Sequence, residues 1–266
     1  MRKVWLITGG AKGMGYAVAM EALKNGDSVI ATTRKENDFV APTEYKDQIL
    51  NLKLDVTDKD EKAFADVAEA GVKKFGKIDI LLNNAGRGRI TFFEETSEEN
   101  MRQLFETNLF GMMKMTKAVL PIMRKQRSGH IINVSSTASF SPGPVLYHTS
   151  KFAVTGFSTS LAFEVAPFGI KVTNAVPGMF GTNFYNKNVW GTNPDNVIED
   201  YNESRWQDSF TENVSNMQFG DLDLLAKRIV EVVSMDNPPS MLPLGDDAPT
   251  VIEGWCESIQ KDINKL

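Results

Sequence analysis

A glycine-rich turn near the start of the sequence constrains the fold more than any other feature. Residues 3–8 form a short apolar run typical of a buried strand, and an apolar pattern of helical period begins at Tyr16. Between them, residues 8–15 read Thr-Gly-Gly-Ala-Lys-Gly-Met-Gly. A strand, a glycine turn and a helix in this order form a cradle for a pyrophosphate, because glycines let the backbone approach the phosphates and the helix N-terminus supplies N–H donors. The candidate phosphate contacts are Gly9, Lys12, Gly13, Met14 and Gly15.

Strand-like and helix-like segments alternate along the rest of the chain. Apolar runs with strand character occupy 28–33, 49–54, 78–82, 130–135, 170–176 and 241–244, and helical patterns occupy 61–75, 98–126, 147–168, 221–235 and 248–264. Such alternation is typical of an α/β domain whose helices cover both faces of a parallel sheet. We therefore expect one domain over residues 1–266, built on a seven-stranded, mostly parallel sheet.

The composition is that of an ordinary soluble globular protein. With 266 residues, of which 42% are hydrophobic and 24% charged, the chain can bury a large core. A net charge of −5 provides no basic footprint, so we expect no nucleic-acid partner. No apolar run approaches the ~20 residues of a membrane span, and no signal peptide precedes the first strand, so we expect no membrane association. The single cysteine, Cys256, excludes an internal disulfide and fits a cytoplasmic location, and we expect no metal site.

Residues after the second and third strands bear on the choice of nucleotide. In proteins that bind NAD, an acidic residue near the end of the second strand accepts hydrogen bonds from the ribose 2′-OH. Here Thr33 occupies that place and Arg34 follows it. A planar guanidinium suits a 2′-phosphate, and Lys12 adds a second positive charge, so these residues favour NADP(H) over NAD(H). After the third strand, Asp55 could hydrogen-bond an adenine amine and Val56 could line the ring.

A tyrosine and a lysine four residues apart form the second candidate site. Tyr147 and Lys151 lie on one face of a helix. A lysine ammonium stabilises phenolate, so the tyrosine pKa should fall, and such a phenol can exchange a proton with a carbonyl or alcohol oxygen. Ser136, just upstream, could hold the same oxygen. Asn108 stands in the middle of the helix predicted over 98–126, where asparagine is unfavourable and needs a structural reason.

These motifs resemble, in order and spacing, those of the short-chain dehydrogenase/reductase family. The resemblance rests on residues 8–15, Asp55-Val56, the Asn-Asn-Ala-Gly at 83–86, Asn108, Ser136 and Tyr147-x-x-x-Lys151, and it runs from about residue 3 to 182. It implies a Rossmann-type doubly wound fold and hydride transfer between NADP(H) and a carbonyl or secondary alcohol. The tail phrase at 243–248, Pro-Leu-Gly-Asp-Asp-Ala, is similar to members grouped with hydroxysteroid and retinol dehydrogenases.

The resemblance also implies a role for each matching residue. Tyr147 would be the general acid/base, and Lys151 would bind the nicotinamide ribose and lower the pKa of Tyr147. Ser136 would orient the substrate oxygen, and the family pattern Ser-x-x-Gly, or a small residue in the glycine place, favours it over Ser135. Asn108 would carry a helix kink and a bound water linked to the lysine. Further cofactor contacts implied by the family are Asn83, Ala85, Gly86, Pro177, Gly178, Phe180 and Thr182.

Residues 183–219 lose regular strand pattern and gain aromatic side chains. In the family this region is a helical substrate lid. Its aromatic density suggests an apolar pocket for an aromatic, steroid-like or long-chain ketone, although the same rings could simply pack the lid onto the core. The family often pairs its two long central helices, here 98–126 and 147–168, so the resemblance implies a homodimer or homotetramer.

Three other functions are weighed against an oxidoreductase. A non-catalytic NADP(H)-sensing regulator on the same fold typically lacks the tyrosine or the lysine, and both are present here. A serine hydrolase needs a Gly-x-Ser-x-Gly elbow between strand and helix, whereas the nearest match, at 156–160, ends in serine and lies inside a predicted helix. A dehydratase or epimerase of the extended fold needs a larger C-terminal substrate domain than this chain has.

Overall fold

Seven parallel strands form one sheet in the computed structural model, which describes residues 2–182, 184, 191–205 and 219–266. The strands are β1 (Val4–Thr8), β2 (Ser28–Thr33), β3 (Ile49–Lys53), β4 (Ile80–Asn83), β5 (Gly129–Val134), β6 (Ile170–Pro177) and β7 (Met241–Leu244). Their order is β3-β2-β1-β4-β5-β6-β7, and every pairing is parallel. This topology confirms the predicted doubly wound α/β fold. Its crevice lies at the carboxyl ends of β1 and β4, where the strand order reverses.

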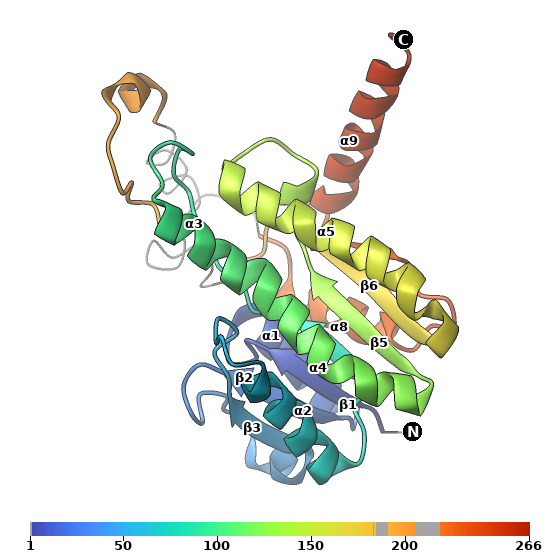
Figure 1. Cartoon of the computed structure of the whole chain (residues 1–266). Helices are drawn as coiled ribbons and strands as arrows, with labels where there is room; N and C mark the ends of the chain where they lie inside the picture. Colours follow the sequence, from blue (N-terminus) through green and yellow to red (C-terminus); the bar gives the residue numbers. More distant parts are fainter. Residues whose placement is uncertain (1, 183, 185–190, 206–218) are drawn as a thin grey trace.

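Helices cover both faces of the sheet (Figure 1). On one face, α1 (Gly13–Lys24) and α8 (Leu222–Val232) pack against each other and against β1, β2 and β4. On the other face, α2 (Glu61–Phe75), α4 (Gly111–Gln126) and α5 (Val145–Val165) enclose a second apolar core. Strands that are apolar on both faces require this double cover. The short 3₁₀ helices are η1 (Thr43–Gln48), η3 (Thr137–Ser139), η4 (Ala166–Phe168) and η6 (Glu199–Ser204).

The helix predicted over 98–126 is interrupted by a wide turn. It comprises α3 (Glu98–Phe105), one π-helical turn, η2 (Glu106–Phe110), and then α4. Asn108 lies in the π turn, at the position where the family resemblance implied a kink. Gly111 follows, and a methyl group at this glycine would lie 2.5 Å from the carbonyl oxygen of Val56. The turn therefore brings α4 into close contact with the loop after β3.

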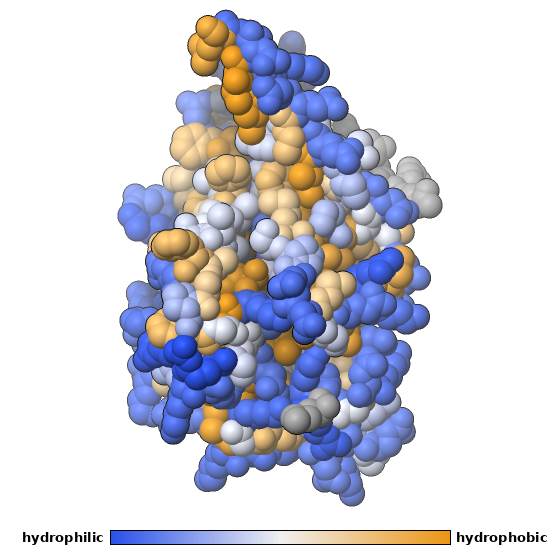
Figure 2. All heavy atoms as spheres, turned by 90° about the vertical axis from the view of Figure 1, so that its right-hand side faces the viewer, coloured by the Kyte–Doolittle hydropathy of each residue, from blue (hydrophilic) through white to orange (hydrophobic). Residues whose placement is uncertain are grey.

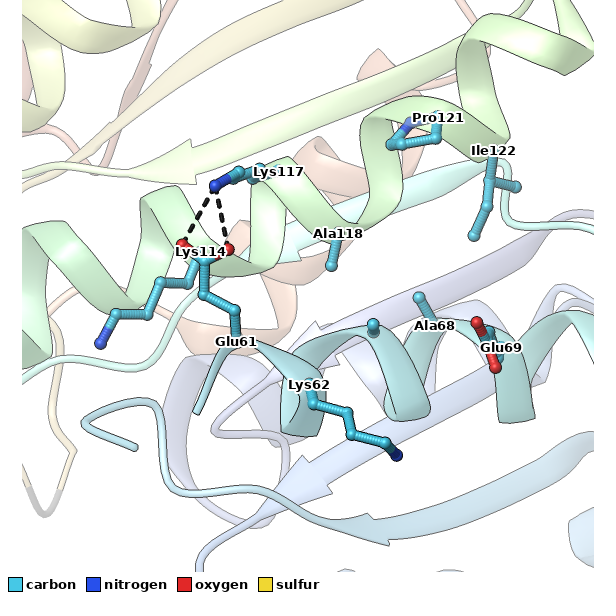
Figure 3. A pocket seen from close by; sticks show the side chains of 10 residues that line it. Glu61, Lys62, Ala68, Glu69, Lys114, Lys117, Ala118, Pro121 and Ile122 are labelled. Atoms are coloured by element: carbon cyan, nitrogen blue, oxygen red, sulfur yellow. Dashed lines mark hydrogen bonds and ion pairs between the residues drawn. The ribbon is translucent and has the colours of Figure 1, made fainter. Parts of the chain in front are cut away.

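The last helix, α9 (Asp247–Ile263), begins beside β7 and projects away from the rest of the molecule (Figure 1). Only Ala248 of this helix is buried. An open groove also runs between α2 and α4 (Figure 3), where Lys117 pairs with Glu61 at 2.9 Å. None of the candidate site residues lines this groove. Within the described ranges, no helix is both long and apolar enough to cross a membrane.

Candidate active site

The glycine turn after β1 has the backbone geometry of an anion cradle. Gly9 and Gly13 have φ angles of 66° and 55°, a region that favours glycine. A methyl group at Gly15 would lie 2.5 Å from Asn84 Nδ2 and 2.6 Å from the Gly9 carbonyl oxygen. Lys12 stands at the N-cap of α1, and its side chain makes no capping hydrogen bond. The first-turn N–H groups of α1 are therefore available to a phosphate.

The segment after β4 braces this turn. Asn84 Nδ2 donates hydrogen bonds to the carbonyl oxygens of Thr8 and Gly9 at 3.0 and 3.1 Å, and the Thr8 hydroxyl accepts from the amides of Asn84 and Ala85. The side chain of Asn83, in contrast, is buried in the core and donates to Thr116 and Asn133. Asn84 was not among the predicted contacts, although the repeated asparagine is the signal that could have identified it.

The ends of β2 and β3 lie on the other side of the glycine turn. The Thr33 hydroxyl donates to the carbonyl oxygen of Lys35 at 2.5 Å, whereas Arg34 is exposed. Asp55 is exposed, and its Oδ1 accepts from the amide and hydroxyl of Thr57 at 2.9 and 2.8 Å. Its other carboxylate oxygen can still accept a bond. Val56 is buried beside it.

Tyr147 and Lys151 are buried side by side on α5, with exposed fractions of 6% and 5%. Lys151 Nζ lies 5.9 Å from the centre of the Tyr147 ring and donates to the carbonyl oxygen of Val134 at 3.0 Å. Burial lowers the pKa of Lys151 to about 8. The ammonium therefore lies close to its titration range at neutral pH, next to the phenol whose ionisation it would stabilise.

The two serines after β5 occupy different environments. Ser135 is buried, and its hydroxyl bonds to the Lys151 carbonyl oxygen at 3.0 Å and to Ser139 and Thr155. Ser136 is half-buried at the N-cap of η3, where its Oγ accepts from the Ala138 amide at 3.1 Å. Ser135 thus anchors α5, and the hydroxyl proton of Ser136 can still be donated.

Asn108 links the π turn to both neighbouring segments of the site. Its Oδ1 accepts from the Arg87 amide, and its Nδ2 donates to the Arg87 carbonyl oxygen and to Ser150 Oγ, all at 2.9 to 3.0 Å. A methyl group at Gly86 would lie 3.5 Å from both Asn108 Oδ1 and Lys151 Nζ. Asn108, Lys151 and the loop after β4 therefore meet around Gly86.

The turn after β6 closes the crevice from the far side. A methyl group at Gly178 would lie 1.8 Å from Asp247 Oδ1, and Asp247 also accepts from the Met179 amide at 3.1 Å. Thr182 lies over the glycine turn, since a methyl group at Gly13 would be 3.2 Å from Thr182 Cγ2. Asp247 was not predicted, because no local pattern connects the start of α9 with this turn.

Phe180 and Pro177 contribute to this turn in different ways from Thr182. The Phe180 side chain is buried in the core under Gly220 and Gly245, so only its main chain can face the crevice. Pro177 is the last residue of β6. The prediction that Phe180 contacts a cofactor can therefore apply to its backbone alone.

An apolar cluster lies against the face of Tyr147. Ile90 and Ala138 are buried there, and the Phe184 ring lies 5.7 Å from the Tyr147 ring. His148 turns to the loop before α5, where its Nδ1 contacts the Ser141 carbonyl oxygen at 2.7 Å. Of the predicted lid, residues 183, 185–190 and 206–218 lie outside the described residues. Among the described residues, no group of three or more His, Cys, Asp or Glu side chains could hold a metal ion.

The comparisons with known proteins agree with this arrangement. The family model described as short chain dehydrogenase matches residues 3–193. The chain belongs to the short-chain dehydrogenase/reductase family. This is a family of oxidoreductases that act on CH–OH and C=O groups, so the chain is classed as such an enzyme.

Similar proteins cover nearly the whole chain. Oxidoreductase BOA17 of Botryotinia fuckeliana is 37% identical over 255 residues, which are 93% of this chain and 90% of that protein. A 3-ketodihydrosphingosine reductase of Bacteroides thetaiotaomicron is 36% identical over 91% of this chain and 88% of its own length. Among solved structures, a short-chain dehydrogenase from Streptomyces avermitilis is 35% identical with a TM-score of 0.86, covering 100% of this chain and 96% of that one.

Relatives of known structure bind nicotinamide nucleotides. ElxO, solved with NADP bound, is 29% identical with a TM-score of 0.73, covering 94% of this chain and 100% of that one. A family member from Burkholderia phymatum, solved in complex with NAD, shares the fold at 21% identity and a TM-score of 0.83, covering 98% of this chain and 95% of that one. A nicotinamide cofactor is thus supported by the neighbours, which include complexes with both nucleotides.

Proposed function

We propose that this chain is an NADP(H)-dependent oxidoreductase that acts on a carbonyl or secondary alcohol, with Tyr147 as general acid/base. The observation that carries the proposal is the buried pair on α5, in which Lys151 Nζ lies 5.9 Å from the centre of the Tyr147 ring. A phenol beside an ammonium of lowered pKa can exchange protons near neutral pH. Ser136 stands at the end of the neighbouring strand and can donate to the same substrate oxygen.

The residues of this chain supply the proton path. In the direction of reduction, Tyr147 donates its phenolic proton to the carbonyl oxygen, and in oxidation it takes the proton back. Lys151, when protonated, stabilises the phenolate that remains. Ser136 holds the oxygen in place, and Asn108 positions Lys151 and the loop after β4. NADP(H), when bound, supplies or accepts the hydride.

The crevice fits such a nucleotide. The positive φ angles of Gly9 and Gly13 let the turn present its backbone to a pyrophosphate, and Gly15 lets the start of α1 pack closely on Asn84 and Gly9. The residues that we propose hold the cofactor are Gly9, Lys12, Gly13, Met14, Gly15, Thr33, Arg34, Asp55, Val56, Asn83, Ala85, Gly86, Tyr147, Lys151, Pro177, Gly178, Phe180 and Thr182. Asn83 and Phe180 would do so through their main chains, because both side chains are buried in the core.

The preference for NADP(H) is proposed from the charges near the end of β2. Arg34 and Lys12 are both exposed and cationic, and no acidic residue occupies the Thr33 position. Arg34→Glu should raise the KM for NADPH at least tenfold while lowering the KM for NADH. Lys24→Glu, at the opposite end of α1, is the matched control. Equal use of NADH by the unaltered enzyme would contradict the preference.

The substrate is proposed to be apolar. Among the described residues, the apolar side chains that pack beside Tyr147 are those of Ile90, Ala138 and Phe184. Relatives include a 3-ketodihydrosphingosine reductase, whose name denotes a long-chain ketone. The tail phrase at 243–248 supports the hydroxysteroid and retinol dehydrogenase-like branch. A long-chain or polycyclic ketone is therefore the substrate class to test first.

The proposal also covers assembly and location. Phe152 and Phe163 on α5 are 51% and 85% exposed, and an oligomer that pairs this helix would cover them. We propose a homodimer or homotetramer on this basis, and a substrate lid over 183–219. A cytoplasmic location is supported by the free thiol of Cys256.

The decisive experiment is NADPH oxidation against a panel of ketones, aldehydes and quinones, with Tyr147→Phe beside the unaltered enzyme. The variant should lose on the order of 10²–10⁴ in turnover, because it lacks the proton donor. NADPH binding, followed by fluorescence, should persist. Tyr45→Phe, in η1 and away from the crevice, is the control. Near-normal activity of Tyr147→Phe would sink the assignment, and NADPH binding by the unaltered protein without turnover of any substrate would indicate a sensing regulator instead.

A further inference from the structure

Two acidic–basic pairs join the loop before α3 to a segment about one hundred residues later in the chain. The loop is 89–97, and the segment is 191–205, which we call the lid arm. Arg89 pairs with Asp195 at 2.9 Å, and Arg205 pairs with Glu95 at 2.5 Å. Figure 1 shows the lid arm in orange beside the start of α3. The two pairs have opposite polarity, because the loop supplies the cation in one and the anion in the other.

The pair between Glu95 and Arg205 is the more buried of the two. The Glu95 side chain is fully buried, and both of its carboxylate oxygens accept from the Arg205 guanidinium. Glu95 Oε1 also accepts from the Ile198 amide at 2.9 Å. The hydrogen bond from Arg205 lowers the pKa of Glu95 despite its burial. The Glu95 carboxylate therefore holds the lid arm in place through Arg205 and Ile198. Losing the Arg205 guanidinium would leave a buried negative charge without compensation.

The pair between Arg89 and Asp195 fixes the other end of the lid arm. Asp195 accepts from the Ser97 amide at 2.7 Å and from Asn100 Nδ2 at 2.8 Å. Burial alone would raise the pKa of Asp195, but the bonds from Ser97 and Asn100 and the charge of Arg89 lower it to about 2. Arg89 is 6% exposed and also donates to the Asn193 carbonyl oxygen at 3.0 Å.

The same loop forms a wall of the candidate active site. Ile90 follows Arg89 directly, is 1% exposed and packs with Tyr147. Its amide donates to the Gly191 carbonyl oxygen at 3.4 Å, at the start of the lid arm. The loop 89–97, which binds the lid arm, therefore also forms part of the surface that faces Tyr147. A shift of the lid arm would be transmitted to Ile90 through this short path.

We propose that Arg89 and Glu95 are positioning residues that hold the lid arm against the active-site wall and thereby determine the shape of the substrate pocket. The proposal rests on the oxidoreductase function proposed above. Neither residue touches the reacting atoms, and both act through Ile90 and the lid arm. Opposite polarity in the two pairs also disfavours a shifted register, because sliding the lid arm would bring like charges together.

The test uses three variants, Glu95→Gln, Arg205→Gln and the double variant that combines these two. Glu98→Gln is the control. The control breaks an ion pair of the same kind on α3, Glu98 with Arg102, whose side chains are 72% and 76% exposed. Kinetics are measured with 2-undecanone and with benzaldehyde. We expect the KM for 2-undecanone to rise at least tenfold in each single variant, with kcat changed less than threefold and NADPH affinity unchanged. The double variant should be no worse than either single one, because the two side chains act as a unit.

A second readout does not depend on turnover. The Ile198 amide donates to Glu95 Oε1, and the Asp195 amide donates to the main-chain carbonyl oxygen of Glu95. Hydrogen exchange of both amides should accelerate at least tenfold in Glu95→Gln, because the lid arm loses its anchor, and stay unchanged in Glu98→Gln. Faster exchange with an unaltered KM would overturn the positioning role. Unaltered exchange would show that the pair between Glu95 and Arg205 does not hold the lid arm in place. If the unaltered enzyme reduces neither ketone nor aldehyde, faster exchange still supports the role of Glu95 in holding the lid arm. The absence of turnover then contradicts the proposed function or its substrate class, not the role of Glu95.

Discussion

Asn83 Nδ2 donates a hydrogen bond to Asn133 Oδ1 at 2.8 Å, across two neighbouring strands beneath α5. Asn174 occupies the same register position on β6, so three buried asparagines form a row across β4, β5 and β6. The row is tied to α5, because Asn133 donates to Ser158 at 2.9 Å and Asn174 donates to Thr155 at 3.1 Å. This polar row fixes α5, and with it Tyr147 and Lys151, against the sheet.

Asn133→Leu should lower the free energy of unfolding by roughly 1–3 kcal/mol, since it leaves the buried amide of Asn83 without one of its partners. Urea denaturation measures the change. Asn264→Leu, at the exposed end of α9, should change stability by less than ~0.5 kcal/mol. Equal stabilities for the two variants would show that the row contributes nothing to holding α5.

Asn108→Ala should lower kcat more than it raises the KM for NADPH. The substitution removes three hydrogen bonds that link the π turn to Arg87 and to Ser150, beside Lys151. We expect a loss of about 10²-fold in kcat, within the range for a displaced proton-transfer group. Ser150→Ala removes only one of these bonds and should cost much less. Similar kcat values for both variants would remove the special role of Asn108.

Two glycines, one in the turn after β1 and one in α5, should respond in opposite ways to substitution by alanine. At Gly15 the added methyl group would collide with Asn84 Nδ2 and with the Gly9 carbonyl oxygen. At Gly156, inside α5, no described atom outside the neighbouring turns of the helix backbone lies within 4 Å of the added methyl group. Gly15→Ala should weaken NADPH binding at least tenfold and cost about 1–3 kcal/mol of stability.

Gly156→Ala should instead stabilise the protein by ~0.5–1 kcal/mol, because alanine loses less backbone entropy than glycine in a helix. Its turnover should match that of the unaltered enzyme. NADPH titration and thermal unfolding measure both variants. If both variants lost NADPH affinity to the same extent, the close contacts of Gly15 would not explain the weaker binding of Gly15→Ala.

The sequence predicts the elements of this fold well because they depend on local pattern. Each of these patterns depends only on residues that are close together in the sequence. Examples are strand periodicity, the glycine turn and the poor helix propensity of Asn108. Tyr147 and Lys151 share a face because helical spacing requires it. The choice of Ser136 over Ser135 agrees with the burial of Ser135 under α5. Their catalytic roles remain predictions that the variants above test.

Contacts between distant segments could not be predicted in the same way. Asp247 supports the turn at Gly178 from 69 positions later in the sequence, and Arg205 reaches Glu95 across 110 positions. Charged residues at such separations have no periodic signature, because their meeting depends on sheet order and loop paths. The burial of the Phe180 side chain was likewise hidden, since a Pro-Gly turn does not reveal which way the next side chains point.

His130 should make the stability of the protein sensitive to mild acid. The side chain is buried in β5, and burial, followed by the charges of Lys171 and Lys3, lowers its pKa to about 4. Thr173 donates its hydroxyl proton to the Pro239 carbonyl oxygen, so at 2.9 Å it accepts from His130 Nε2. The folded state therefore holds a neutral imidazole with its proton on Nε2.

The sign of the effect follows from proton binding. An unfolded histidine titrates near pH 6.5, so between pH 6.5 and 4 the unfolded state binds more protons than the folded state, and stability falls as the pH falls. The loss from this one group approaches ~3 kcal/mol at pH 4. His130→Asn keeps a hydrogen-bond donor without the titration. Urea unfolding at pH 7.5 and 4.5 should show a shallower pH dependence for the variant, and identical slopes would mean that His130 does not become protonated on unfolding.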